Sequence, residues 1–206
     1  MSNRISLAGW RRAMAELYAQ VRTIAETDPA RACEFFRGGR DRMFREHSDS
    51  PIPPGERAHW TRASWFRYEP AWRTMGMVKP LASPATFDVP LAVDGITRCT
   101  RVAMVQFTLR AKPTTLSLYW FEGYGGGLWL PFGDATNGVS TYGGGRYLYD
   151  TIKGADLGAS EKRFVLDFNF AYNPSCAYDD RWSCPLPPRE NRLPFDVEAG
   201  ERMPRQ

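Results

Sequence analysis

The sequence MVQFTLRAKPTTLSLYWFEGYGGGLWLPF, residues 104–132, contains three short apolar runs separated by turn-forming segments. The runs cover residues 104–109, 116–121 and 128–132, and every second residue of each run is apolar. A period of two is typical of β-strands, because successive side chains point to opposite faces. Three strands at roughly twelve-residue spacing, with turns between them, predict an antiparallel meander.

Further strands are predicted on both sides of this meander. Residues 86–93 alternate in the same way, and Asp94 with the glycine after it forms a hairpin signal. Pro90 restricts that strand to a sheet edge, because proline has no amide to donate. Residues 146–150 and 164–171 supply two more strands. The total favours an antiparallel β-sandwich or a partly closed barrel.

Two helices are predicted before the strands. Apolar residues recur at steps of three and four along residues 7–25, which is the pattern of an amphipathic helix. Asp28 and Pro29 then suit the N-cap and the first position of a second helix. Gly38 and Gly39 lie inside that helix and cost about 1 kcal/mol each relative to alanine, so packing holds it or it breaks there. The expected fold is therefore mainly β (α+β), with an N-terminal helical hairpin packed on the β domain.

Prolines divide the chain. Residues 48–55, SDSPIPPG, cannot be helical, because three prolines lack amide donors and restrict the residues before them. They separate a helical hairpin and its linker, residues 1–50, from a β domain, residues 51–206, and the chain length suits one structural unit. After Pro185 the chain is rich in proline and is predicted to cross the surface as a strap ending in a polar tail, residues 200–206.

Composition argues against several classes of protein. The chain has 27 Lys and Arg against 23 Asp and Glu, and a net charge of +4 is too mild to indicate nucleic-acid binding. No long uncharged apolar run predicts a membrane span. Residues 1–17 lack the continuous apolar core of a secretory signal, so the four cysteines are expected to be mostly reduced and the protein cytoplasmic. The oligomeric state is left open.

Polar residues occupy the last predicted strand. Asp167 and Asn169 share its face opposite four apolar side chains, and both residue types are rare in strands and need partners. The simplest partner is Arg146, paired with Asp167 across adjacent strands. This pair is either a buried tie between strands or a cationic fork that orients a polar or anionic ligand.

A turn-rich loop precedes Arg146. GDATNG, residues 133–138, and a triple glycine flank Tyr142, and this loop either contacts a ligand or is shaped by its own turns. Asp134 and Asp167 are weak candidates for a general base, without a reaction being assigned. No metal site is expected and no cofactor is identified. The predicted ligand-binding residues are Asp134, Tyr142, Arg146, Asp167, Asn169 and Tyr172.

Cys176 and Cys184 lie eight residues apart in CAYDDRWSC. Zinc-ligand spacings are not matched, and His47 and His59 are the chain's two histidines. Structural thiols, a local disulfide and thiol chemistry remain open.

Four motifs resemble a known family. Residues 132–148, FGDATNGVSTYGGGRYL, are followed by residues 167–178 and 184–194, and residues 40–51 also fit. Together they resemble domain-of-unknown-function family 1684, uncharacterised proteins mainly of bacteria and archaea. The resemblance implies a mostly β domain and no activity.

Three functions remain open, and whether the protein is an enzyme is one of the open points. The first is binding of a small polar or anionic ligand in a pocket of the β domain. The second is non-enzymatic docking by the basic helical hairpin, whose arginines otherwise form a solvated face. The third is hydrolysis by an Asp-activated water, which needs Asp134 and Asp167 within about 10 Å of each other. The arginines in question are Arg37, Arg40, Arg42 and Arg45.

Overall fold

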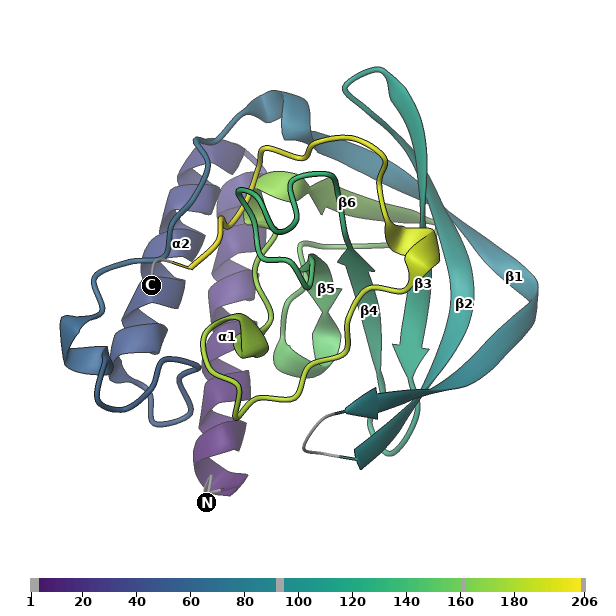
Figure 1. The fold of residues 1–206 in the computed structure, drawn as a ribbon. Helices are drawn as coiled ribbons and strands as arrows, with labels where there is room; N and C mark the ends of the chain where they lie inside the picture. The colour runs from purple at the N-terminus through teal and green to yellow at the C-terminus, as the bar shows by residue number, and fades with distance from the viewer. Residues whose placement is uncertain (1–3, 92–94, 161, 205–206) are drawn as a thin grey trace.

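The computed structural model describes residues 4–91, 95–160 and 162–204, and its architecture is two helices against a curled antiparallel sheet (Figure 1). Helices α1 (Arg4–Ala25) and α2 (Pro29–Glu46) form the expected hairpin and lie on one side of the sheet, which bows away from them. The sheet has the order β5-β4-β3-β2-β1-β6. Its strands are β1 (Arg73–Leu91), β2 (Gly95–Leu109), β3 (Lys112–Phe121), β4 (Gly127–Phe132), β5 (Arg146–Asp150) and β6 (Arg163–Asp167).

The sheet is the partly closed barrel of the two predicted forms. The predicted meander is confirmed as β2, β3 and β4, which pair in sequence order. The strand expected at residues 86–93 lies in β1, which begins earlier, and residues 85–91 pair with β2 alone. The Asp94 part of the hairpin signal lies outside the described residues. Because β6 joins β1 and β5 joins β4, the last two strands lie at opposite ends of the sheet.

The last strand is shorter than its apolar alternation predicts. β6 ends at Asp167, and Phe168–Phe170 form a 3-10 turn. The Asp167 carboxylate accepts a hydrogen bond from the Asn169 amide at 3.0 Å, which stabilises the turn instead of an extended backbone. The expectation of a strand to residue 171, with Asp167 and Asn169 on one face, was therefore wrong.

Helix α2 passes through its two glycines without a break. Asp28 caps it by accepting a hydrogen bond from the Arg31 amide at 3.0 Å, and Pro29 is its first residue. A Cβ atom on Gly39 would lie 2.5 Å from Leu17 Cδ1, whereas one on Gly38 would meet nothing within 4 Å. The close approach of α1 therefore requires glycine at position 39, and the packing of the two helices compensates for the low helix propensity of this residue.

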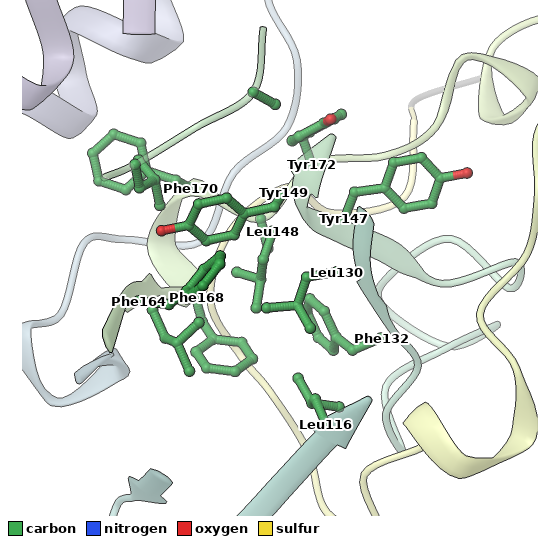
Figure 2. Close-up of a cluster of buried hydrophobic side chains, with 14 of the residues drawn as sticks. Leu116, Leu130, Phe132, Tyr147, Leu148, Tyr149, Phe164, Phe168, Phe170 and Tyr172 are labelled. Atoms are coloured by element: carbon green, nitrogen blue, oxygen red, sulfur yellow. The ribbon is translucent and has the colours of Figure 1, made fainter. Parts of the chain in front are cut away.

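Aromatic and aliphatic side chains fill the space inside the curled sheet (Figure 2). Phe132 and Phe168 pack edge to face, with ring centroids 5.1 Å apart. The Tyr149 hydroxyl lies 2.6 Å from the Val165 carbonyl oxygen, so a side chain of β5 bonds the backbone of β6 across the open seam. The half-barrel is thus a packed core closed at its seam by a tyrosine.

The C-terminal segment, residues 171–204, crosses the molecule and changes from green to yellow along its length in Figure 1. Val197 and Ala199 are completely buried, and Glu201 is 1% exposed. Gly200 has φ +74°, and a Cβ there would lie 2.5 Å from the Ala171 carbonyl oxygen. The prediction of a surface strap with a polar tail was wrong for this part, because Val197, Ala199 and Glu201 are buried, although Glu198 between them is exposed.

Candidate functional site

Arg146 is completely buried at the centre of a hydrogen-bond network. Its Nη2 atom donates to Asp134 Oδ2 at 2.8 Å and to the Val197 carbonyl at 2.9 Å. Its Nη1 atom donates to the carbonyls of Ala199 and Glu201. Burial lowers the pKa of Arg146, and the Asp134 carboxylate opposes that effect. The predicted pair of Arg146 with Asp167 was wrong, because β5 and β6 are not adjacent and Asp134 is the partner.

The loop that carries Asp134 is organised by its own side chains. Asp134 Oδ1 accepts hydrogen bonds from the Thr136 amide at 2.9 Å and the Val197 amide at 3.2 Å. Asn137 in turn accepts a hydrogen bond from the Asp134 amide at 2.7 Å. Both Asp134 oxygens therefore have protein partners, and the loop has the self-made turn structure that was one of its two interpretations.

Asp167 and Asn169 form a second, separate cluster. Asp167 is opposite Arg73 in the pairing of β6 with β1, and Arg73 Nη1 lies 3.3 Å from Asp167 Oδ2. Asn169 donates to Asp167 at 2.9 Å and bonds both the amide and the carbonyl of Glu69. Burial raises the pKa of Asp167, while Asn169 and Arg73 lower it. The cluster joins β6 to the segment that leads into β1.

Tyr172 lies beneath a third cluster. The Arg40 guanidinium lies 4.7 Å from the centre of its ring, and Arg40 Nη2 is 3.2 Å from Glu201 Oε2. Glu201 also accepts hydrogen bonds from the Asn173 amide at 2.7 Å and from the Tyr178 hydroxyl. Arg40 is 4% exposed, so the prediction that it belongs to a solvated face was wrong. Burial raises the pKa of Glu201, which no sequence pattern singled out.

Tyr142 lies apart from these clusters, in the wall of an open cleft of about 710 Å³. We call it the Tyr142 cleft, and its hydroxyl donates to Cys176 Sγ at 3.6 Å. The rings of Trp60 and Tyr178 contribute another wall, with centroids 5.8 Å apart at 80°. Glu56 lies on the rim.

The polar lining of the Tyr142 cleft is acidic. Glu56, Asp179 and Asp180 line it, and among the described lining residues there is no Arg or Lys. Asp179 Oδ2 is 3.1 Å from Arg181 Nε, so one of the three carboxylates has a cationic partner beside the cleft. Aromatic rings with carboxylates suit hydroxyl or amine groups better than anions.

A basic groove of about 520 Å³ lies elsewhere, between α2 and residues 62–67. Arg37 lies over the Trp65 ring at 4.9 Å, and Arg202 lies over the Phe66 ring at 5.0 Å. Glu34 and Asp41 are the acidic residues on its α2 side. The four arginines that line it are Arg37, Arg62, Arg67 and Arg202.

The geometry and the sequence agree with one family. The model of a protein family of unknown function, DUF1684, matches residues 58–202. The chain belongs to the DUF1684 family. The match covers both buried clusters on Arg146 and Asp167 and most of the Tyr142 cleft, whereas α1 and α2 precede it.

A solved structure supports the fold of this DUF1684 member. The chain is similar to an uncharacterised protein of Haloarcula marismortui, determined in solution by NMR, at 36% identity and a TM-score of 0.59. The match covers 81% of this chain and 89% of the archaeal chain. No curated protein matches the chain.

Two further observations concern classes of site in this DUF1684 member. In the part of the chain that the structure describes, no three His, Cys, Asp or Glu side chains gather in a way that holds a metal ion. Within residues 4–91, 95–160 and 162–204, neither long helix has the length and apolar character needed to cross a bilayer.

The six residues predicted to bind a ligand thus lie in four places. Asp134 and Arg146 share one buried cluster, and Asp167 and Asn169 share another. Tyr172 packs on Arg40, and Tyr142 is the member that lines the open cleft. Sequence reasoning missed Trp60 and Tyr178 as cleft residues, because Trp60 lies outside the four motifs and Tyr178, which ends the motif of residues 167–178, forms no sequence pattern with Tyr142.

Proposed function

We propose that this DUF1684 protein binds a small polar ligand in the Tyr142 cleft. The observation that carries the proposal is the volume of about 710 Å³ beside Tyr142, within the range typical of small-molecule sites. Tyr142 belongs to the motif on which the family resemblance rests, and it is partly exposed to the cleft. The Arg146 and Glu201 clusters support this site by fixing the loops behind it.

The lining favours a ligand with hydroxyl or amine groups. Trp60 and Tyr178 present aromatic faces and edges, on which organic cations and sugars stack. Within the described part of the chain, Glu56 and Asp180 form no ion pair, so they add negative charge. An anion would lose hydration near these carboxylates without gaining a cationic partner in the lining. Of the two ligand classes, polar and anionic, the polar one is therefore the one that we propose.

The arrangement gives less support to an Asp-activated water. The side chains of Asp134 and Asp167 are both 0% exposed, and each accepts several hydrogen bonds from protein groups. A general base must reach the proton that it removes, directly or through one water. Neither carboxylate lines the Tyr142 cleft.

Ligand binding is testable through the Trp60 indole N–H signal in a nitrogen–proton correlation spectrum. Choline and glucose, each at millimolar concentration, are expected to shift this signal, while citrate is not. Trp129, which is completely buried, supplies an internal reference that stays unshifted. Trp60→Phe identifies the signal. Citrate acting alone, or no shift from choline and glucose, would overturn the proposal.

The basic groove supports a second candidate, docking of an acidic partner on a surface that α2 forms together with residues 62–67 and Arg202. Arg62 and Arg67 are exposed in the groove and form no ion pair with any residue that the structure describes. An oligoglutamate peptide is the probe, with binding measured by fluorescence anisotropy at low salt. Arg62→Glu with Arg67→Glu is expected to weaken binding at least tenfold, about 1.4 kcal/mol, relative to the matched Arg11→Glu with Arg12→Glu on α1. Equal weakening by both changes would show non-specific attraction.

A further inference from the structure

Cys176 and Cys184 lie side by side, and Cys176 lines the Tyr142 cleft. Both are partly exposed free thiols. The Cys176 amide donates to Cys184 Sγ at 3.3 Å. One N–Cα bond adds about 1.5 Å, so Cys176 Cα lies within about 4.8 Å of the Cys184 sulfur. A disulfide between them requires little backbone movement.

The surroundings of Cys184 stabilise a thiolate. The Cys176 thiol donates a hydrogen bond to the Cys184 sulfur, and this contact lowers the pKa of Cys184 most. The Lys153 ammonium and the amides of Ser175 and Cys176 act in the same direction, against desolvation. Lys153 Nζ also lies 3.5 Å from Asp150 Oδ2, and this carboxylate offsets part of the effect of the ammonium on Cys184. Thiolates are the nucleophilic form of cysteine.

The other two cysteines provide a contrast within the chain. Cys33 is 1% exposed and Cys99 is completely buried. Burial raises the pKa of each of them to about 12. Both are therefore thiols that pack in the core, whereas the Cys176 and Cys184 pair has access to a cleft.

We propose that Cys176 and Cys184 form a redox-active dithiol that exchanges with small disulfides entering through the Tyr142 cleft. The Cys184 thiolate attacks one sulfur of R–S–S–R, which forms a mixed disulfide and releases R–S⁻. Cys176 then loses its proton and attacks the Cys184 sulfur, which closes the protein disulfide and releases a second R–S⁻. The Cys176 proton passes to one released thiolate, the other released thiolate takes from solvent the proton that Cys184 gave up on ionising, and two electrons pass from the protein to the small disulfide.

The Tyr142 hydroxyl positions the second sulfur. It donates to Cys176 Sγ from the cleft wall, and this hydrogen bond lowers the pKa of Cys176 against the larger effects of the Cys184 contact and burial. Tyr147 donates to the carbonyl of Pro185 and anchors the backbone next to Cys184. Both sulfurs are thus held by residues of the same motif.

A preference among disulfides rests on the proposed function, but formation of the protein disulfide does not. The acidic lining favours cystamine, a dicationic disulfide, over the dianion dithiodiglycolate. Equal rates of protein oxidation by the two compounds would contradict the charge preference of the cleft but not the formation of the protein disulfide.

The experiment treats the reduced full chain with cystamine and follows its mass and its cysteine peptides. The expected result is loss of two hydrogens without a retained adduct, with Cys176 linked to Cys184 and with Cys33 and Cys99 unmodified. A stable adduct on the wild-type chain, no reaction, or equally fast oxidation of Cys33 and Cys99 would overturn the proposal.

Single substitutions separate the two sulfurs. Cys176→Ala is expected to stop the reaction at one cystamine adduct on Cys184, because the resolving thiol is gone. Cys184→Ala is expected to slow the first step at least about tenfold, because the stabilised thiolate is gone. Circular dichroism confirms folding, and Cys176→Ser and Cys184→Ser replace any variant that does not fold. Unchanged rates in folded Cys184 variants contradict the mechanism.

Discussion

Residues 132–148 build two regions of opposite character. Arg146 and Asp134 are enclosed, and the hydrogen bonds of the guanidinium go to protein oxygens. Tyr142, between them in sequence, turns outward and shares its hydroxyl with a thiol at an open cleft. A motif of polar residues therefore does not indicate a single site. Its charged residues, Asp134 and Arg146, bind backbone groups, whereas the uncharged Tyr142 lines the cleft.

The largest effect is expected on the buried side. Arg146→Met leaves Asp134 without its cation and the carbonyls of residues 197, 199 and 201 without their donor. Removing one partner of a buried pair costs about 3–5 kcal/mol. Urea denaturation measures this loss.

An exposed pair of the same chemistry is the control. Arg98 Nε lies 3.1 Å from Asp88 Oδ1, with side chains 64% and 51% exposed. Arg98→Met is expected to change the free energy of unfolding by less than about 1 kcal/mol. Similar losses for Arg98→Met and Arg146→Met would remove the distinction between enclosed and open regions.

An intermediate effect is expected at the Arg73 and Asp167 pair, because Arg73 is 27% exposed. Asp167→Asn keeps an acceptor for the Asn169 amide but places an amide group near Arg73, at a cost of about 1–3 kcal/mol. Urea denaturation from about pH 4 to pH 7 gives the size and the pH dependence of this cost.

The sign of the pH dependence follows from the raised pKa of Asp167. The folded state holds the proton more tightly than the unfolded state, so this contribution to stability is fully present below the unfolded pKa of about 3.9. It is lost as the pH rises through the folded pKa. The stability advantage of wild type over Asp167→Asn should therefore shrink toward neutral pH, and an advantage that grows would contradict the burial of this carboxyl.

The smallest effect on stability is expected in the cleft. Tyr142→Phe removes a hydroxyl whose described partner is a sulfur at 3.6 Å, so the free energy of unfolding should change by less than about 1 kcal/mol. The same variant should slow closure of the protein disulfide several-fold, as measured with cystamine. A large loss of stability with unchanged exchange would assign Tyr142 to the scaffold.

The local elements were predictable because their signals are local. The alternation in residues 104–132 gave β2, β3 and β4, and Asp28 with Pro29 gave the start of α2. The failure of the predicted Arg146 and Asp167 pair could not be foreseen in this way, since it depends on β6 joining the far end of the sheet. Glu201 and Trp60 gave no signal, because their roles arise from contacts with residues distant in sequence.

The partners of Arg146 also impose an order on biosynthesis. Its most distant carbonyl partner, that of Glu201, is 55 residues further along the chain. At about 5–20 residues per second, a ribosome needs roughly 3–11 s to add these 55 residues. When the peptide bond to Glu201 forms, part of this segment still lies in the ribosomal exit tunnel. Arg146 can therefore complete its hydrogen bonds to the C-terminal segment only after translation has passed residue 201. A nascent chain arrested earlier would expose to proteases a sheet that lacks the hydrogen bonds between Arg146 and the C-terminal segment.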